Sequence, residues 1–169
     1  MIEKETKNKE YCSKLDEARN YREVWKIVKS TVKESLGETR GGMILFLDDL
    51  SLNLGAYHPV GTNNIVLNRR LLEIIKATIK SKQEVNAFTY SLLTHEYLHA
   101  IGHLSEEEVR QLVCKVSQEC FGEKHVTTEL AKKSPWILLK NIPITNISTR
   151  KAPIEVIKDF EKIDHTYIV

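Results

Sequence analysis

The chain has 169 residues, of which 41% are hydrophobic and 28% charged, and it carries a formal net charge of +2. These proportions favour one globular domain with a single core, spanning residues 1–169, and argue against a disordered or fibrous chain. The nearly balanced charge lacks the basic excess that binding to a nucleic-acid backbone requires. We therefore expect no nucleic-acid partner.

The amino terminus and the cysteines both indicate a cytoplasmic protein. No apolar segment follows the charged start MIEKETKNKE, and no apolar run approaches the roughly 18 residues of a membrane span, so we expect neither secretion nor a membrane partner. The three cysteines, Cys12, Cys114 and Cys120, form no C-x-x-C pair. We expect reduced thiols instead of a disulfide framework.

The first half of the chain is predicted to form a helix, two strands and a second helix. Apolar residues recur at helical spacing from about Glu10 to Leu36, which predicts one amphipathic helix that stops at Gly37. Short apolar runs at Met43–Leu47 and Ile65–Leu67 are bounded by turn residues and predict strands. Asn68 can cap a helix that continues to Lys80.

A helix from about Glu84 to Ile101 is apolar almost all round, so we expect it in the middle of the domain. Gly102 is a stop signal, and Ser105 can cap the next helix, Glu106–Phe121. The last part of the chain is predicted to mix extended pieces, among them residues 135–139, with a short helix near Ile154–Ile163.

This order of elements predicts an α+β fold that is mostly helical, with a small sheet beside the buried helix. We divide the domain into an N-terminal helix (residues 1–37), the sheet and central helices (42–121) and a C-terminal extension (135–169). Whether the extension covers a cleft or packs on the core stays open.

The buried helix contains the sequence HEYLHAIGH, from His95 to His103. Residues four apart lie one above the other on a helix, so the imidazoles of His95 and His99 can converge on one ion. Glu96 lies beside them, where its carboxylate can take a proton from water held by zinc and pass it to a leaving group. The alternative is a satisfied polar cluster inside the core.

This segment resembles the active-site helix of the zincin metallopeptidases, and NNIVLN resembles the strand beside the substrate cleft in their small intracellular members. The resemblance covers roughly residues 55–116. It implies His95 and His99 as metal ligands and Glu96 as general base. It also implies that Ile65–Leu67 is a strand able to pair with an extended peptide.

The third metal ligand has to be argued from geometry. The metzincin pattern H-E-x-x-H-x-x-G-x-x-H would put it at Ser105, which cannot serve, so the chain departs from that branch. If the helix after Gly102 folds back antiparallel, its first turn lies closest to the histidines. There Glu106 shares the inward stripe, Glu107 points away and Glu108 lies at the edge, so we choose Glu106, a gluzincin-like arrangement.

Other candidates remain open. His103 can join the site only if the backbone turns at Gly102, and it otherwise lies at the rim. Glu119 has the separation from His99 that larger gluzincins use, but an antiparallel helix carries it past the metal. His58 can face the cleft from its loop, whereas His125 and His165 have no visible partners in the sequence.

These observations predict a zinc-dependent hydrolase, a metallopeptidase with one Zn²⁺ per chain and a peptide or protein substrate. Because Glu96 is not needed to hold zinc, the sequence favours an enzyme over a purely structural site. The alternative is a non-catalytic zincin-like regulatory or protein-interaction module. No residue of a specificity pocket can be identified from the sequence, since large aromatics such as Trp136 and Tyr57 are more often packing residues than parts of a substrate site. Neither the substrate nor the oligomeric state can be read from the sequence.

Overall fold

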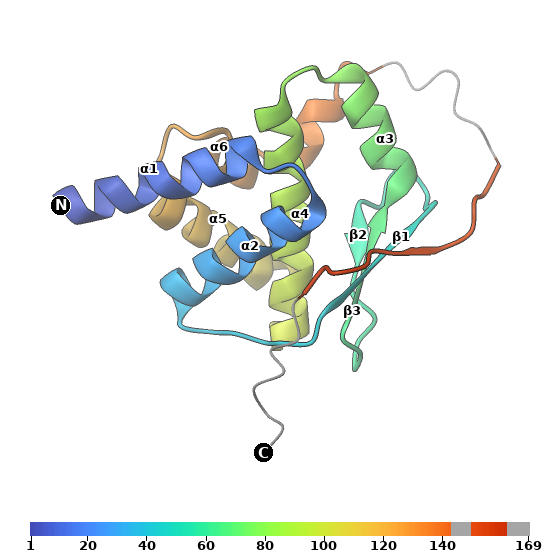
Figure 1. Cartoon of the computed structure of the whole chain (residues 1–169), viewed down its shortest axis with the longest axis horizontal. Coiled ribbons are helices and arrows are strands. Elements are labelled where there is room, and N and C mark those ends of the chain that lie inside the picture. Colours follow the sequence, from blue (N-terminus) through green and yellow to red (C-terminus); the bar gives the residue numbers. More distant parts are fainter. Residues whose placement is uncertain (143–149, 162–169) are drawn as a thin grey trace.

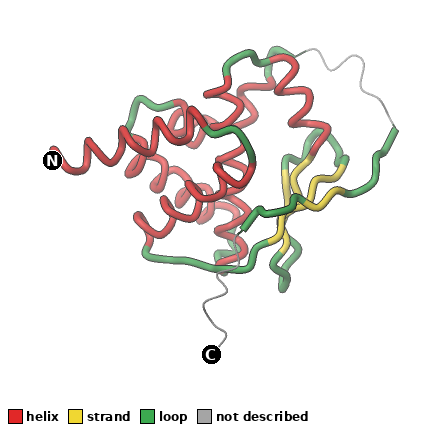
Figure 2. Tube along the Cα trace, in the orientation of Figure 1, coloured by secondary structure: helices red, strands yellow, loops and turns green. Residues whose placement is uncertain are grey.

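The structure is a computed structural model that describes residues 1–142 and 150–161. Within these residues the chain forms six α-helices and a mixed four-stranded sheet, which confirms the predicted α+β class (Figures 1 and 2). The helices are α1 (Ile2–Glu17), α2 (Tyr21–Leu36), α3 (Arg69–Thr78), α4 (Lys82–Ile101), α5 (Glu106–Phe121) and α6 (Val126–Lys133), followed by the short 3-10 helix η1 (Pro135–Leu139). The strands are β1 (Ile44–Asp48), β2 (Ala56–Tyr57), β3 (Asn64–Asn68) and β4 (Glu155–Val156).

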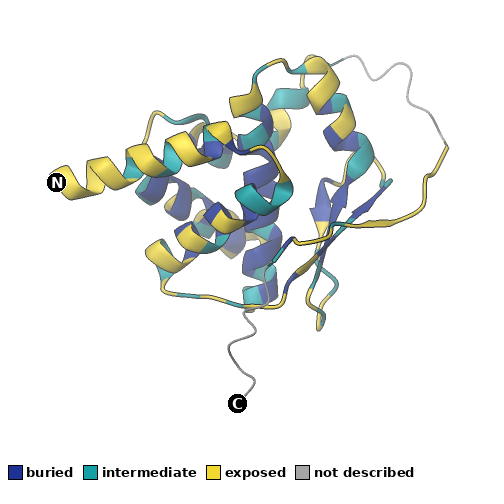
Figure 3. Cartoon of the chain, in the orientation of Figure 1, coloured by how far each residue is buried: buried dark blue, intermediate teal, exposed yellow. Residues whose placement is uncertain are grey.

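The central element is α4, which runs between the other helices and the sheet (Figure 1). It is buried along most of its length (Figure 3), as its apolar residues predict. Ser81 caps the helix, which begins at Lys82, two residues before the predicted start at Glu84. Helices α1, α2, α5 and α6 contact it on one side, and β2 and β3 contact it on the other. The two faces of α4 therefore connect the helical layer to the sheet.

The single helix predicted from Glu10 to Leu36 is wrong, because the chain forms two helices, α1 and α2, with a break between them. The Asn20 side chain accepts a hydrogen bond from the backbone N–H of Glu23 at 2.9 Å, and the Glu23 carboxylate accepts one from the backbone N–H of Arg19 at 2.8 Å. This reciprocal cap starts a new helix at Tyr21. The predicted stop at Gly37 is confirmed, with a left-handed φ of 71°.

The sheet has the order β2-β3-β1-β4, with β1 and β3 parallel and the two short outer strands antiparallel to their neighbours. The predicted strands at Met43–Leu47 and Ile65–Leu67 are both present, each shifted or extended by a residue. However, β3 lies between β2 and β1, so both of its edges are already paired. The expectation that Ile65–Leu67 itself pairs with a peptide is therefore wrong, and the open edge next to α4 belongs to β2.

Asn68 links the sheet to the loop before β2. Its side chain accepts a hydrogen bond from Leu71 N–H and so caps α3, as predicted. The same buried amide donates to the carbonyls of Ser51 and Leu54 at 3.0 and 2.8 Å, and its oxygen accepts from Leu50 N–H. One side chain thus fixes the path of the chain that leads into β2.

The predicted helix near Ile154–Ile163 is wrong within the described residues, since Glu155 and Val156 form β4 against β1. Strand β4 lies at the sheet edge opposite β2, so residues 150–161 run along the far side of the sheet from that open edge. Glu161 fixes their end, because its carboxylate accepts hydrogen bonds from the backbone N–H groups of Gly42 and Met43 and from Lys29. Ile163, like the rest of residues 162–169 and residues 143–149, lies outside the described part.

The segment between α5 and β4 also differs from expectation. Helix α6 was not predicted, because its eight residues are too few for a clear periodic pattern. Residues 135–139 form a 3-10 helix instead of an extended piece. Cys12, Cys114 and Cys120 are free thiols, as expected, and no helix within residues 1–142 and 150–161 combines the length and apolarity needed to cross a bilayer.

Candidate metal centre and its cleft

The three predicted metal ligands come together where α4 ends and α5 begins. Gly102 ends α4 with a φ of 130°, a conformation that residues with a side chain rarely adopt. Ser105 then caps α5 by accepting a hydrogen bond from Glu108 N–H at 3.3 Å. This short connection puts Glu106, the first residue of α5, next to the last turns of α4, as the antiparallel arrangement predicts.

The side chains of His95, His99 and Glu106 each turn one potential ligand atom toward a common point. These atoms lie within 4.8 Å of one another. The two Nε2 atoms are 3.2 Å apart, and the Glu106 carboxylate oxygens lie 3.1 Å from His95 Nε2 and 2.9 Å from His99 Nε2. One carboxylate therefore spans both imidazoles, which are one helical turn apart.

A hydrogen bond at the second ring nitrogen fixes the orientation of the His99 ring. Its Nδ1 lies 2.7 Å from the backbone carbonyl of His103, which can only accept a hydrogen bond. His99 Nδ1 therefore carries a proton and donates it, and this contact directs Nε2 toward Glu106 and His95. A metal-ligating histidine typically donates its second ring nitrogen to such a carbonyl, because this fixes both tautomer and ring orientation.

Burial and neighbouring charges set the protonation of the cluster. Burial lowers the pKa of His95 against the opposing effect of Glu106, which favours the neutral imidazole that metals bind. Burial acts to raise the pKa of Glu106, but His95 and His99 lower it more strongly, so its carboxylate stays ionised. The set thus offers two imidazole nitrogens and one negative oxygen.

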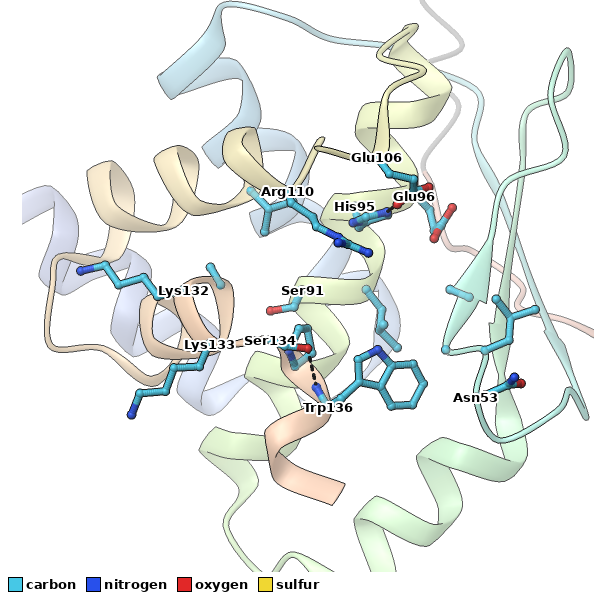
Figure 4. A pocket seen from close by; sticks show the side chains of 17 residues that line it. Asn53, Ser91, His95, Glu96, Glu106, Arg110, Lys132, Lys133, Ser134 and Trp136 are labelled. Carbon is cyan, nitrogen blue, oxygen red and sulfur yellow. Dashed lines mark hydrogen bonds and ion pairs between the residues drawn. The ribbon is translucent and has the colours of Figure 1, made fainter. Parts of the chain in front are cut away.

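Glu96 follows His95 on α4 and faces the cleft beside this cluster (Figure 4). It is 8% exposed, and burial raises the pKa of its carboxyl to about 7, although His99 and a backbone hydrogen bond from His58 oppose the shift. A carboxyl group with a pKa near neutrality can both accept and return a proton. The histidine that the sequence left as a loop candidate, His58, thus contributes its backbone N–H here.

The structure does not bring the alternative ligands to the cluster. His103 is held by two carboxylates, with Nε2 at 2.8 Å from Glu38 and Nδ1 at 3.0 Å from Glu108. Glu119 instead accepts a hydrogen bond from Ser35 on α2 at 2.5 Å. Glu107 is exposed and takes no part in the cluster.

The remaining histidines lie elsewhere. His125 caps α6 and its Nε2 lies 3.0 Å from Asp16, so it has the partner that the sequence did not reveal. His165 lies outside the described residues.

A cavity of about 600 Å³ opens beside the cluster and is lined by His95, Glu96 and Glu106 at one end (Figure 4). Its sheet-side wall includes Gly55 and Ala56, at and just before the start of β2, and Trp136 of η1 closes part of the opposite end. The sequence does not identify Trp136 as a residue of the cleft, because nothing local connects it to α4. Tyr57 does not line this cavity.

Two polar residues of the cavity were missed by the sequence analysis. Ser91 precedes His95 by one helical turn, and Arg110 follows Glu106 by one turn, so both lie on the faces that carry the ligands. That spacing was readable from the sequence once His95 and Glu106 were chosen.

The donor set fits a divalent metal of the zinc type. Imidazole nitrogens and one carboxylate are ligands that zinc accepts, and three protein ligands leave a position for water or substrate. A purely structural zinc site would usually supply four. Comparison with models of protein families, with curated proteins and with solved structures finds no match to this chain, so its site is interpreted from its own geometry.

Proposed function

We propose that the protein is a zinc-dependent hydrolase, a zincin-like metallopeptidase that uses Glu96 as its general base. The observation that carries the proposal is the convergence of His95, His99 and Glu106 within 4.8 Å, next to a buried carboxyl group at the end of a cavity. A structural polar cluster would need neither the cavity nor the unused carboxyl of Glu96. The proposed site would hold one Zn²⁺ per chain.

Zinc bound by these three residues would lower the pKa of a coordinated water and polarise the carbonyl group under attack. Glu96 accepts the proton from the attacking water and then donates it to the leaving amine, a role that suits its raised pKa. His99, fixed by the His103 carbonyl, keeps its Nε2 directed at the site while the substrate changes.

A peptide is the substrate that the cleft fits best. Strand β2 lies at the end of the sheet order, so one of its edges has no strand partner among the described residues. Its first residue, Ala56, lines the same cavity as Glu96. An extended peptide can add to such an edge through backbone hydrogen bonds, which would hold its amide bond along the site.

The first experiment measures metal content. We expect purified protein to contain close to one zinc per chain by inductively coupled plasma mass spectrometry. His99→Ala should lose most of this zinc. His103→Ala should keep it, because both ring nitrogens of His103 contact other carboxylates, those of Glu38 and Glu108. Equal zinc content in wild type and His99→Ala would refute the site.

The second experiment measures hydrolysis of a pool of internally quenched peptides by the zinc-loaded protein. Glu96→Gln should retain zinc and lose cleavage, because an amide cannot accept the proton. Glu107→Gln, an equal change of charge on α5, serves as the matched control and should cleave normally. Full cleavage by Glu96→Gln would refute the mechanism, and a zinc-loaded wild type that binds peptides without cleaving them would favour the non-catalytic module.

A further inference from the structure

The helix-side wall of the cleft is cationic. Arg110 of α5 and Lys132 and Lys133 of α6 line it. In the described part of the chain, the only carboxyl groups that line the cavity are those of Glu96 and Glu106 at the proposed metal site. Both lysines have acidic neighbours of their own, since Lys132 pairs with Glu123 and Lys133 with Glu129. Of these three charges, only that of Arg110 has no ion-pair partner within residues 1–142 and 150–161.

Arg110 lacks the partner that its helix would normally give it. Glu106 precedes it by four residues, the spacing at which an acidic and a basic side chain commonly form an ion pair on a helix. Here Glu106 turns to His95 and His99 instead. Among residues 1–142 and 150–161, no side chain forms an ion pair or a hydrogen bond with Arg110, and Figure 4 shows it pointing into the cleft beside His95.

A second polar group of the wall is also unsatisfied. Ser91 is 2% exposed, and its hydroxyl has no hydrogen-bond partner in the described part of the chain. It lies on the cleft-facing side of α4, one turn before His95 (Figure 4). A buried hydroxyl without a partner costs free energy, so a ligand that accepts its proton would be favoured there.

We propose that Arg110 is a specificity-determining residue that binds a carboxylate of the substrate close to the bond to be cleaved, with Ser91 as a second donor. A guanidinium can hold a carboxylate with two parallel hydrogen bonds, which no neutral side chain reproduces. The inference rests on the proposed function for the position of the cleaved bond. The carboxylate belongs either to an acidic side chain or to the carboxyl terminus of the substrate.

Binding can be measured separately from cleavage by using the zinc-loaded Glu96→Gln protein. The fluorescence of Trp136, which lines the cavity, reports titration with short peptides. One peptide pair differs only by aspartate against asparagine, with the terminus amidated. The other pair is neutral in its side chains and differs only by a free against an amidated carboxyl terminus.

We expect one of these pairs to favour the carboxylate by about ten- to a hundredfold in Kd, the usual effect of hydrogen bonds to a charged group. The pair that discriminates identifies the source of the carboxylate. Arg110→Gln should abolish the preference for the carboxylate. Arg110→Lys should retain only part of it, because lysine cannot form the bidentate hydrogen bond. Lys115→Gln, which removes a charge from α5 outside the cavity, should keep the preference.

The outcomes separate this inference from the proposed function. Equal binding of all four peptides, or a carboxylate preference that survives Arg110→Gln, overturns the role of Arg110 even if the wild type cleaves peptides. A preference that depends on Arg110 without any cleavage by the wild type supports the carboxylate site and refutes the hydrolase. If Arg110→Gln lowers kcat equally for amidated and carboxylate peptides and leaves KM unchanged, Arg110 acts on the reacting group and the inference is wrong.

Discussion

Replacing Glu106 by Gln tests the metal centre through the one ligand that comes from α5. Residues that only support a metal ligand typically contribute 10- to 100-fold to affinity, so loss of a direct carboxylate ligand should weaken zinc binding by at least about 100-fold. At a zinc concentration of 100 times the wild-type Kd, bound zinc stabilises the fold by about 2.7 kcal/mol. At that same concentration Glu106→Gln should lose most of this stabilisation.

For a domain of this size, that difference corresponds to about 5–11 °C in the zinc-induced shift of Tm. The assay is thermal unfolding of each variant with and without zinc, followed by circular dichroism. Glu107→Gln removes the same charge from the same helical turn, so it should keep the full zinc-induced shift. Equal shifts for the two variants would show that Glu106 is not a ligand.

Three further predictions concern contacts that stabilise the fold. Gly102→Ala should lower the free energy of unfolding by about 1–3 kcal/mol, because Gly102 has a positive φ that alanine rarely adopts. The same variant should also bind zinc more weakly in a competition titration. The control Gly37→Ala should destabilise the fold without changing the zinc affinity. The Arg69 side chain lowers the pKa of Asp49, so this carboxylate stabilises the fold above its unfolded pKa of about 3.9 and loses that effect as the pH falls through the lower folded value. Asp49→Asn should therefore cost at least about 1 kcal/mol in urea unfolding at pH 7 and clearly less in strong acid, whereas an equal cost at both pH values would contradict the ion pair. Glu161→Ala should cost about 3 kcal/mol in urea unfolding, because the half-buried Lys29 ammonium loses its carboxylate, and a cost below about 1 kcal/mol would contradict this anchor.

The sequence predicted the elements whose signals are local. Asn68, Gly102 and Ser105 begin or end helices through contacts within a few residues, so their roles could be read directly from the chain. The same applies to Glu106, whose position follows from the Ser105 cap and the short connection. Whether the cluster binds zinc stays a prediction.

The features that depend on distant partners could not be predicted. Strands β2 and β4 have two residues each, too few for an alternating pattern, and they exist because β3 and β1 offer them free edges. For this reason the sequence placed the open edge of the sheet on the wrong strand, β3 instead of β2. The contribution of Trp136 to the cavity likewise depends on the packing of η1 against α4.

The break at Asn20 is a different kind of failure. Its signal, an asparagine followed three residues later by Glu23, is local and was available in the sequence. The continuous apolar periodicity across the break concealed it. A cap therefore carries information that periodicity alone does not.

All three donors of the metal cluster lie in one helical hairpin, with His95 and Glu106 only eleven positions apart in the sequence. Contacts of such short range can form early in folding, whereas β2, which borders the cavity, joins the sheet through pairing with β3. At the proposed metal site, ion binding and completion of the cleft would therefore be separable events during folding. On the proposed function, the helical hairpin of a nascent chain would bind zinc before the edge of β2 forms and can pair with a peptide.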